Sequence, residues 1–368
     1  MHNRQFIKKI PSTFVDEDDF KLDCPNYPFT PSVLPAAKRI IVIGDIHGDL
    51  ELAVESFKLA KLIDDNFYWI ADPPNTIVVQ VGDQIDSCRP IPGHNECHNK
   101  LLKNDKPEDM AVIDFFNQMH IKATKSGGAV YSLLGNHELM NAEADFRYVS
   151  YENYYNFKYR NYVGPAGRTA AFKPGGKVAK MLACTRKSVL IIGSNMFVHA
   201  GVLPALVNNI NDINFDSHTQ LTYLNSIVRK WLLNKMDYLE PNDISNKTLF
   251  IDDKNLSPFW TRIYGQIKPN TSIDSRQCNT FVKDTLKVFK IGKIVIGHTP
   301  QLLMNGVGIN GTCLEKGSDG HLWRVDGGFS KAFNVFGSQN IIQVLEILDD
   351  TKFTVLTATI NKPVTKIR

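Results

Sequence analysis

The sequence lacks the segments that take a protein into a membrane or through the secretory pathway. No apolar run is long enough to span a bilayer; the run from Val189 to Val207 comes closest, but Ser194, Asn195 and His199 interrupt it. The first residues hold no apolar h-region of a signal peptide, and the last residues hold no lipidation motif. We therefore expect a soluble protein of the cytoplasm with no membrane partner.

Cysteine and net charge are also low. The six cysteines are too few and too dispersed for a disulfide scaffold, so we expect a reducing compartment, with one local exception treated below. The net charge of +4 over 368 residues gives no indication of a nucleic-acid partner. The apolar and charged fractions are those of an ordinary globular protein, and no internal repeat or low-complexity tract is present.

Short apolar runs that indicate buried strands recur along the chain, with helical patterns between them. Helices are expected at 50–62, after the capping residue Asp49, and at 107–125. Strands alternating with helices predict a layered α/β fold. The expected strands are Arg39–Ile43, Thr76–Val81, Ala129–Leu134, Met196–His199 and Lys293–Gly297.

The chain divides into an N-terminal extension and one domain. We expect residues 1–36 to lie over a domain that spans 37–362. Insertions at about 140–186 and about 205–290 are predicted to be mainly helical. The last predicted strands follow one another without helices, so the sheet is expected to finish antiparallel; these strands are Leu322–Val325, Ile341–Leu348 and Phe353–Ala358.

Five polar segments directly follow apolar strands, and together they predict a two-metal centre. Ligands of layered α/β folds bind at the carboxyl ends of the strands, so these segments are expected to meet. Each motif alone is weak, because a lone histidine is usually a structural residue, but five in this order are not. Carboxylate, imidazole and amide ligands suit Mn, Fe or Zn. The segments are Gly44–Gly48, Gly82–Asp86, Gly135–Glu138, His199–Gly201 and Gly297–Pro300.

The ordered set resembles the calcineurin-like metallophosphoesterases. Within them it is most similar to the phosphoprotein phosphatase branch and its Shewanella-like protein phosphatases, over residues 38 to 330. The resemblance implies a four-layer α/β/β/α sandwich with helical cap insertions. Three further stretches carry the similarity to the last group: Arg168 with Pro174–Gly176, Trp260–Arg262, and Val325–Ser330.

The resemblance also implies a ligand set for two divalent or trivalent metal ions. Asp45, His47 and Asp83 would hold the first ion, and Asp83 would bridge to a second that Asn136, His199 and His298 complete. Such a pair of ions clamps the phosphate and activates a hydroxide for in-line attack.

A general acid is needed for the leaving group. His137 is the candidate, because it lies beside Asn136, and Asp86, three residues after Asp83, can orient its imidazole. The resemblance assigns the same two roles. The alternative for Asp86 is a solvated loop residue.

The phosphate-binding arginine that the protein phosphatases carry directly after the equivalent of Asp86 is absent, since Ser87 stands there. Arg89, two residues further on, is a candidate replacement, although Pro90 restricts its backbone. Arg168 and Arg262 are the better candidates for gripping phosphate, since a guanidinium matches phosphate bidentately; their alternative is that of surface arginines.

Two segments leave alternatives open. Residues 88–98 hold Cys88, Cys97 and two histidines, and they form a plain loop, a redox-sensitive disulfide or a metal site. Half of the tyrosines fall between Tyr148 and Tyr162 with helical spacing. We predict one helix there that forms a lid over the cleft; the alternative is a surface that stacks nucleic-acid bases.

We expect a metal-dependent phosphoprotein phosphatase that hydrolyses phosphomonoesters of a phosphoprotein or phosphopeptide. The first alternative is a dinucleoside polyphosphate hydrolase on the same fold. The second is a catalytically silent scaffold, which only the missing arginine at position 87 favours. The sequence leaves open the metals, the choice between Ser/Thr and Tyr phosphate, and the oligomeric state.

Overall fold

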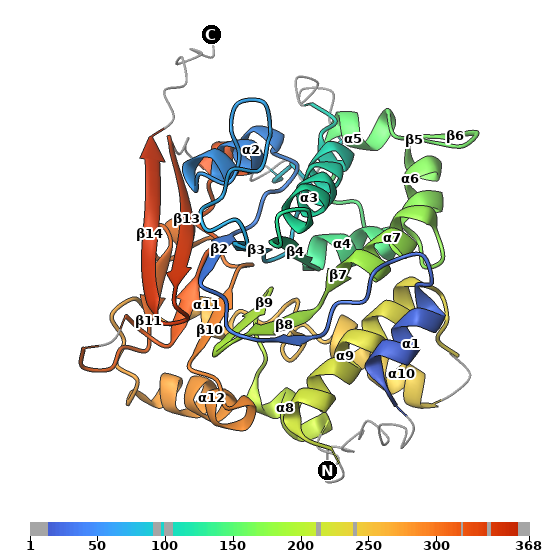
Figure 1. Ribbon diagram of the computed structural model, residues 1–368. Coiled ribbons are helices and arrows are strands. Elements are labelled where there is room, and N and C mark those ends of the chain that lie inside the picture. The colour runs from blue at the N-terminus through green and yellow to red at the C-terminus, as the bar shows by residue number, and fades with distance from the viewer. Residues whose placement is uncertain are drawn as a thin grey trace.

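Two six-stranded sheets form the centre of the computed structural model, which describes residues 14–90, 97–98, 106–210, 215–237, 241–317, 319–336 and 340–359 (Figure 1). The first sheet has the order β14 (Lys352–Thr359), β13 (Ile341–Leu348), β2 (Arg39–Ile43), β3 (Ile77–Gln80), β4 (Ala129–Leu133) and β7 (Arg186–Lys187). The second has the order β1 (Val33–Leu34), β8 (Val189–Ile192), β9 (Asn195–Val198), β10 (Lys293–Ile296), β12 (Leu322–Arg324) and β11 (Asn310–Thr312).

The sheets and their helices make the four layers that the sequence predicted. Val42 and Val79 of the first sheet pack against Phe197 and Val295 of the second in one apolar cluster. On the outer face of the first sheet, a second cluster joins the strands to α2 (Leu50–Leu59) and α3 (Asp109–Thr124). A third cluster joins the second sheet to helices that include α7 (Lys177–Thr185), α9 (Ser217–Leu232) and α12 (Asp284–Phe289).

The predicted strands are confirmed within one or two residues at each end. Strands β2, β3 and β4 are parallel, because helices α2 and α3 return the chain to the starting edge of the sheet. The antiparallel finish is confirmed for the last two strands, since β13 pairs antiparallel with both β14 and β2. It is wrong for Leu322–Val325, because β12 lies in the second sheet and pairs parallel with β10. The Asp49 carboxylate caps α2 by accepting a hydrogen bond from the Leu52 N–H at 3.1 Å.

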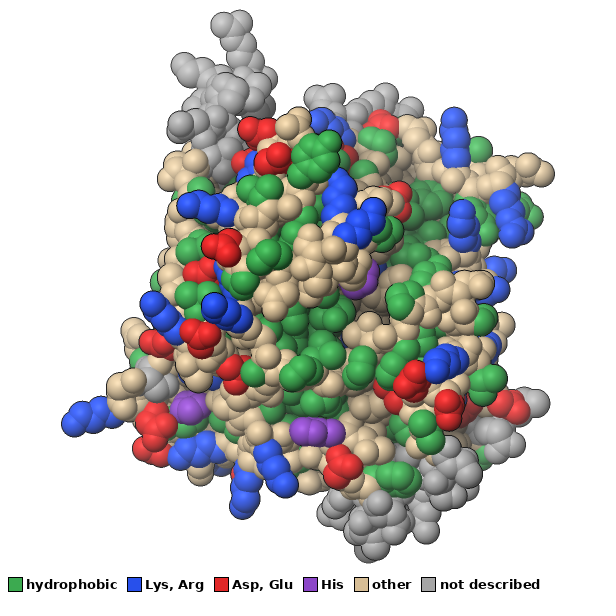
Figure 2. Space-filling model, in the orientation of Figure 1, with side chains coloured by type: hydrophobic (Ala, Val, Ile, Leu, Met, Phe, Trp, Pro, Cys, Tyr) green, Lys and Arg blue, Asp and Glu red, His purple; other side chains and the backbone are tan. Residues whose placement is uncertain are grey.

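The first insertion holds helices, but the long tyrosine helix is wrong. Helix α5 ends at Tyr155, and a hairpin of β5 (Lys158–Tyr159) and β6 (Tyr162–Val163) follows it. Aromatic and β-branched residues favour this pairing over a helix. Figure 2 shows basic side chains gathered over the hairpin and its neighbour α6. The helices of this insertion are α4 (Asn136–Ala142), α5 (Tyr151–Tyr155), α6 (Pro165–Phe172) and α7.

The second insertion is helical as predicted. Besides α9 and α12 it holds two π-helical segments, Thr248–Asp252 and Cys278–Lys283. Helix α13 (Gln301–Asn305) and a 3-10 segment (Lys331–Phe336) follow later in the chain. The other helices of this insertion are α8 (Pro204–Ile210), α10 (Pro241–Lys247) and α11 (Ile263–Gln266). In the part of the chain that the structure covers, no helix is long and apolar enough to cross a membrane.

The described part of the N-terminal extension packs onto the domain. Helix α1 (Asp16–Asp23) lies against α9, where Asp19 and Asp23 accept hydrogen bonds from the Arg229 guanidinium. After α1 the chain crosses the edge of both sheets and forms β1, which pairs with β8. The division into residues 1–36 and 37–362 stays a prediction, and residues 1–13 and 360–362 lie outside the described residues.

The expectation of reduced cysteines is wrong. All six form disulfides, which join Cys24 to Cys184, Cys88 to Cys97, and Cys278 to Cys313. Two of the pairs lie 160 and 35 residues apart in the sequence, so the dispersed positions come together only in the fold.

We expect peptide mapping without reduction to find these three linked pairs and no others. Digestion in the presence of a thiol-blocking reagent, followed by mass spectrometry, measures both the linked peptides and any blocked cysteine. A parallel reduced digest is the control. A Cys88 or Cys184 peptide recovered in blocked form from the oxidised protein would contradict the pairing.

Candidate metal centre

Polar residues follow the carboxyl ends of parallel strands in both sheets. Positions 43, 80 and 132 are in register across β2, β3 and β4, and positions 198, 296 and 324 are in register across β9, β10 and β12. The residues just beyond these positions therefore meet at one edge of the sandwich. They are Asp45, Asp83, Asn136, His199, His298 and Asp326.

Asp83 lies between two groups of side chains that could hold metal ions. One group is His47, Asp83 and His137, and the other is Asp83, His199 and His298; the candidate ligand atoms of each group lie within 4.8 Å of one another. The Asp83 Oδ2 atom is 3.8 Å from His47 Nε2 and 3.3 Å from His199 Nε2. A carboxylate shared by both groups is placed to bridge two ions.

The imidazoles are oriented by backbone carbonyls. One ring nitrogen of His47, His199 and His298 bonds to a carbonyl oxygen, which leaves the other nitrogen available to the centre. The acceptors are Ile85 O at 3.2 Å from His47 Nδ1, Val81 O at 2.8 Å from His199 Nδ1, and Trp260 O at 3.1 Å from His298 Nε2. The Asn136 Oδ1 atom lies 3.0 Å from His199 Nε2, so the amide belongs to the second group.

Three buried carboxylates leave the centre short of positive charge. Burial and repulsion from Asp326 and Asp83 raise the pKa of Asp45 well above its usual value. Burial raises the pKa of Asp326 to about 6, and the charge of Asp83 adds to this effect. The Asp326 Oδ2 atom is buried and has no hydrogen-bond partner. An orphaned carboxylate oxygen beside two more acids is the environment that a bound cation would complete, so the donor set fits metal ions.

The turns that carry the ligands have backbone conformations that most side chains avoid. The φ angles of His47, Asp83, Asp86 and His298 are +48°, +54°, +73° and +67°. Left-handed conformations at residues other than glycine cluster at functional sites, where surrounding contacts hold them. Ten other described residues also have positive φ, so these conformations support the centre only together with the chemistry of its side chains.

Glu138 holds the turns of two strands together. Its carboxylate accepts hydrogen bonds from the N–H groups of Gly135, Asp83 and Gln84 at 2.7, 3.0 and 2.8 Å. The approach is so close that a Cβ atom on Gly135 would lie 2.1 Å from Asp83 Oδ1, so only glycine fits there. Asp83 and the start of α4 are consequently one unit.

His137 and Asp86 are paired as the sequence predicted. The His137 Nδ1 atom is 2.8 Å from Asp86 Oδ2, and the Asn141 amide donates to both Asp86 oxygens at 2.9 and 3.0 Å. Asp86 is fully buried, so it is no solvated loop acid. The other ring nitrogen, Nε2, lies 3.9 Å from Asp83 Oδ2 and is directed at the centre.

Arg168 lies behind this pair and is fully buried. Its guanidinium donates to Asp109 Oδ2 at 2.7 Å, to Asn141 Oδ1 at 2.7 Å and to Asp86 Oδ1 at 3.3 Å. Burial raises the pKa of Asp109 to about 6, although Arg168 opposes this effect. All of the guanidinium nitrogens bond within the protein, which leaves none directed at a substrate.

Arg89 and Arg262 lie at the centre itself. The Arg89 guanidinium is 4.6 Å from the centre of the Phe333 ring and 5.5 Å from that of Tyr148, and it bonds to the Asp86 carbonyl at 3.1 Å. Arg262 is exposed and donates to the His298 carbonyl at 3.3 Å. Each metal-ligand group therefore has one arginine beside it.

Cys88 and Cys97 form a disulfide, so of the three alternatives for this segment the disulfide is confirmed, and the plain loop and the metal site are wrong. The disulfide links Cys88, two residues after Asp86, to Cys97, nine residues further along the chain. The Cys88 N–H donates a hydrogen bond to the Tyr148 carbonyl at 3.1 Å. These contacts position Arg89 between its two aromatic neighbours.

Three residues of the site had no role in the sequence analysis. Asp326 lies in a quoted stretch and follows β12 as His298 follows β10, so the strand-end argument applied there could have found it. Asp109 lies at the start of the predicted helix 107–125, where an acidic residue is expected for the helix N-terminus alone. Asn141 gave no signal, because its role depends on α4 placing it four residues after His137.

Comparisons with known proteins agree with the fold and the motifs. A family model described as calcineurin-like phosphoesterase matches residues 38–302. An uncharacterised protein of Acanthamoeba polyphaga mimivirus is 58% identical over 249 residues, which is 66% of this chain and 98% of that protein. Shewanella-like protein phosphatase 2 of Arabidopsis thaliana is 25% identical over 397 residues, 96% of this chain and 88% of that protein.

Among solved structures, the cold-active protein-tyrosine phosphatase of a psychrophilic Shewanella species superposes with a TM-score of 0.60. The match covers 89% of this chain and 83% of that one at 19% sequence identity. At this identity the likeness shows a shared fold.

Metal affinity should decrease as the pH is lowered, because protons and metal ions compete for the buried carboxylates. The pKa of Asp326, a buried neighbour of the ligands, is raised to about 6, so most of its negative charge is lost at about pH 5. Mn²⁺ binding should therefore be weaker at about pH 5 than at about pH 7.5, with about tenfold as the upper bound for the contribution of this residue. The same shift makes the metal-free protein less stable as the pH rises from about 4 to about 6, since over this range the folded state holds the proton more tightly than the unfolded state.

Calorimetric titration of metal-free protein with MnCl₂ at both pH values measures the effect. Asp326→Asn should flatten the pH dependence. Equal affinity of the unsubstituted protein at both pH values would refute the competition.

Arg168→Met should lower the free energy of unfolding by about 3–5 kcal/mol, because it leaves Asp86 and Asp109 buried without their cation. Urea unfolding near pH 7 measures the loss. Arg147→Met, at an exposed surface pair with Asp145, is the matched control and should change stability by about 0.5 kcal/mol or less. Unchanged stability with a raised KM would instead support the predicted contact with phosphate.

Proposed function

Because the chain belongs to the calcineurin-like phosphoesterase family, we propose that it is a metal-dependent phosphoprotein phosphatase that hydrolyses phosphomonoesters. The observation that carries the proposal is the His137–Asp86 pair beside a carboxylate shared by two groups of candidate metal ligands. A scaffold without activity has no need of a buried acid–base pair directed at such a centre. Relatives named protein phosphatases support the substrate class.

In this proposal Asp45, His47 and Asp83 would hold one metal ion, and Asp83 would be shared with the second. Asp45 takes the place of His137 in the first candidate group, since its Oδ2 atom lies 3.9 Å from His47 Nε2 and His137 is assigned to proton transfer. Asn136, His199 and His298 complete the second site. When bound, the two ions lower the pKa of a water molecule and neutralise charge on the phosphate. Manganese, iron and zinc all suit these ligands.

His137 acts as the general acid. Its Nδ1–H donates to Asp86, so the neutral ring has its lone pair on Nε2, and the imidazolium form carries a transferable proton there. The buried Asp86 carboxylate stabilises that imidazolium. As the bond from phosphorus to the leaving oxygen breaks, the Nε2 proton passes to that oxygen, and the leaving group departs as a neutral alcohol or phenol.

Arg89 and Arg262 contact the phosphate, one beside each metal-ligand group. Arg89 takes the part of the arginine that Ser87 replaces. Arg168 has a different role in this proposal, since its burial and its bonds to Asp86 and Asn141 suit a positioning residue for the His137–Asp86 pair. Its predicted contact with phosphate is therefore replaced by this role.

The cytoplasmic location stays a prediction, and the disulfides weigh against it. Three disulfides are typical of proteins from oxidising environments, whereas cytosolic cysteines are usually reduced.

His137→Ala should lower kcat by about 10²–10⁴-fold, because the imidazole transfers a proton to the leaving group. The metal content should stay the same, because all of the proposed metal ligands are still present. The loss should be largest for alkyl phosphates, whose leaving groups need the proton most, and smaller for p-nitrophenyl phosphate. Asp83→Asn is the matched comparison and should lose both metal and turnover. Steady-state kinetics and elemental analysis measure the two effects. Full activity of His137→Ala on an alkyl phosphate would eliminate the general acid.

A substrate panel tests the reaction class. We expect metal-stimulated release of phosphate from phosphoserine, phosphothreonine or phosphotyrosine peptides when the protein is assayed with Mn²⁺, Fe²⁺, Zn²⁺ and Mg²⁺. Diadenosine tetraphosphate is the comparison substrate, and a preference for it would establish the nucleotide hydrolase instead. Failure to hydrolyse p-nitrophenyl phosphate with any of the metals would leave the silent scaffold.

A further inference from the structure

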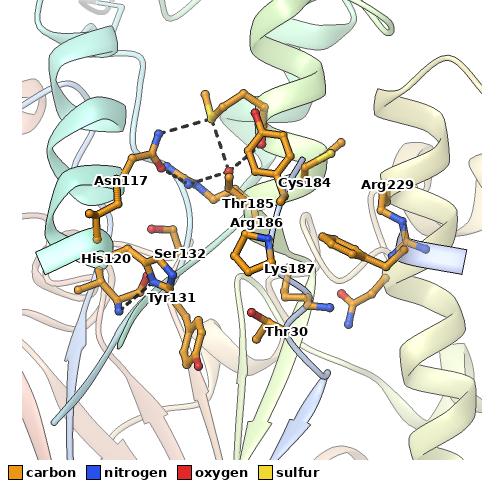
Figure 3. A pocket seen from close by; sticks show the side chains of 18 residues that line it. Thr30, Asn117, His120, Tyr131, Ser132, Cys184, Thr185, Arg186, Lys187 and Arg229 are labelled. Atoms are coloured by element: carbon orange, nitrogen blue, oxygen red, sulfur yellow. Dashed lines mark hydrogen bonds between the residues drawn. The ribbon is translucent and has the colours of Figure 1, made fainter. Parts of the chain in front are cut away.

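A cavity of about 370 Å³ opens at the edge of the first sheet, and none of the candidate metal ligands lines it. It exists because β7 has only two residues and pairs with positions 132 and 133 of β4, so the side of β4 at Val130 and Tyr131 has no neighbouring strand. The walls come from α3, β4, the end of α7, β7, α9 and the chain between α1 and β1 (Figure 3). Its volume lies in the range of small-molecule sites.

The N-terminal wall is fixed in place by covalent and ionic bonds. This wall is formed by Phe20, Tyr27, Pro28 and Thr30. Cys24, which lies between Phe20 and Tyr27 in the chain, forms a disulfide with Cys184 at the end of α7, and Cys184 itself lines the cavity. Helix α1 is held by its ion pairs with Arg229. The cavity is therefore a built feature of the fold rather than a gap beside a loose segment.

Most of the lining is apolar. Phe20, Tyr27 and Pro28 of the N-terminal wall face Ile121 and Met181 from the helices. This combination of flat and flexible side chains suits an aromatic or aliphatic body.

The charged groups of the lining have one sign. Arg186, Lys187 and Arg229 line the cavity, and within the described part of the chain no Asp or Glu does. Arg229 is neutralised by Asp19 and Asp23, so it offers little free charge. An excess of cations in an apolar cavity indicates an anionic ligand.

Lys187 is the cation with the least compensation. Its ammonium lies 5.9 and 5.5 Å from the centres of the Phe20 and Phe29 rings, and the described residues supply neither an ion pair nor a hydrogen bond to it. Burial lowers the pKa of Lys187 to about 8, although Asp16 opposes this effect. An anion beside the ammonium would provide the missing charge.

Arg186 offers a second donor. Its terminal nitrogens bond to Asn117, Thr185 and Gln84, whereas Nε is buried and has no partner. Figure 3 shows the two side chains leaving β7 in different directions, Arg186 towards Asn117 and Lys187 towards Thr30. The polar ends of the cavity are thus separated by its apolar walls.

We propose that this cavity binds a small amphipathic anion, with its acidic group beside Lys187 and its apolar body between the N-terminal wall and the helices. The proposal concerns a second site and does not depend on the proposed phosphatase activity.

The probe is 2-naphthoate, and its neutral amide, 2-naphthamide, has the same ring system without the charge. Calorimetric titration of the full chain should give a dissociation constant in or below the millimolar range for 2-naphthoate. Charge-assisted contacts in buried sites predict binding about tenfold or more weaker for the amide. Added MnCl₂, which loads the metal centre, should leave the affinity for 2-naphthoate unchanged.

Four variants locate the site. Lys187→Met should weaken 2-naphthoate binding about tenfold or more, whereas Lys187→Arg keeps the charge and should retain it within about threefold. Lys293→Met is the matched control, because Lys293 also lies over an aromatic ring, that of Phe353, but does not line the cavity. This variant should bind 2-naphthoate as tightly as the unsubstituted protein. Thr30→Phe fills the cavity from its wall and should abolish binding of both compounds.

The proposal is overturned by any of four results: no binding of 2-naphthoate at millimolar concentration, equal affinity for the amide, an affinity that depends on added MnCl₂, or unchanged binding to folded Lys187→Met or Thr30→Phe. Circular dichroism and thermal unfolding establish that each variant is folded. If Lys187→Met fails to fold, Thr30→Phe and the comparison with the amide still decide the question.

Discussion

The structure depends on concentrating buried negative charge where the two sheets meet. Asp45, Asp83 and Asp326 come from three strands, and burial and mutual repulsion raise the pKa of two of them. Burial alone would also raise the pKa of Asp83, but the neighbouring His199 and His137 hold it well below its usual value. A protein that folds around such a cluster stores an electrostatic penalty that protons or metal ions relieve. The fold therefore creates the demand for cations that the histidines and the amide of Asn136 then direct.

A second buried network supports the first. Arg168 lies between Asp86 and Asp109, so two carboxylates and one guanidinium are removed from water together. Such networks contribute little net stability, but they fix geometry, because each partner would be left unpaired by any movement of the others. Here the geometry that they fix is the orientation of the His137 imidazole. The chain thus separates the groups that take part in the proposed chemistry from those that hold them.

The sequence predicts strand ends well and long-range pairings poorly. Asp45, Asp83, Asn136, His199 and His298 each follow an apolar run, and parallel strands in register must bring such positions together. The pairing of Cys24 with Cys184 depends on where α1 and α7 pack, which no local pattern encodes. The same holds for Arg168, whose flanking motif indicated a phosphate contact while its surroundings in the fold provide two acids. The helical spacing of the tyrosines was misleading, because Tyr159 and Tyr162, three residues apart, pair across the hairpin of β5 and β6.

The left-handed turns at His47, Asp83, Asp86 and His298 place two separate demands on each position. The backbone there accepts glycine and asparagine most readily, whereas the proposed chemistry accepts only a carboxylate or an imidazole. No other residue type satisfies both the backbone and the proposed chemistry at these positions, so we expect substitutions there to be rare. Variation among related chains should accordingly collect beside the centre, at positions such as Arg89 and its aromatic neighbours Tyr148 and Phe333, where φ is not positive. Divergence in substrate choice can then proceed around a centre that is itself unable to drift.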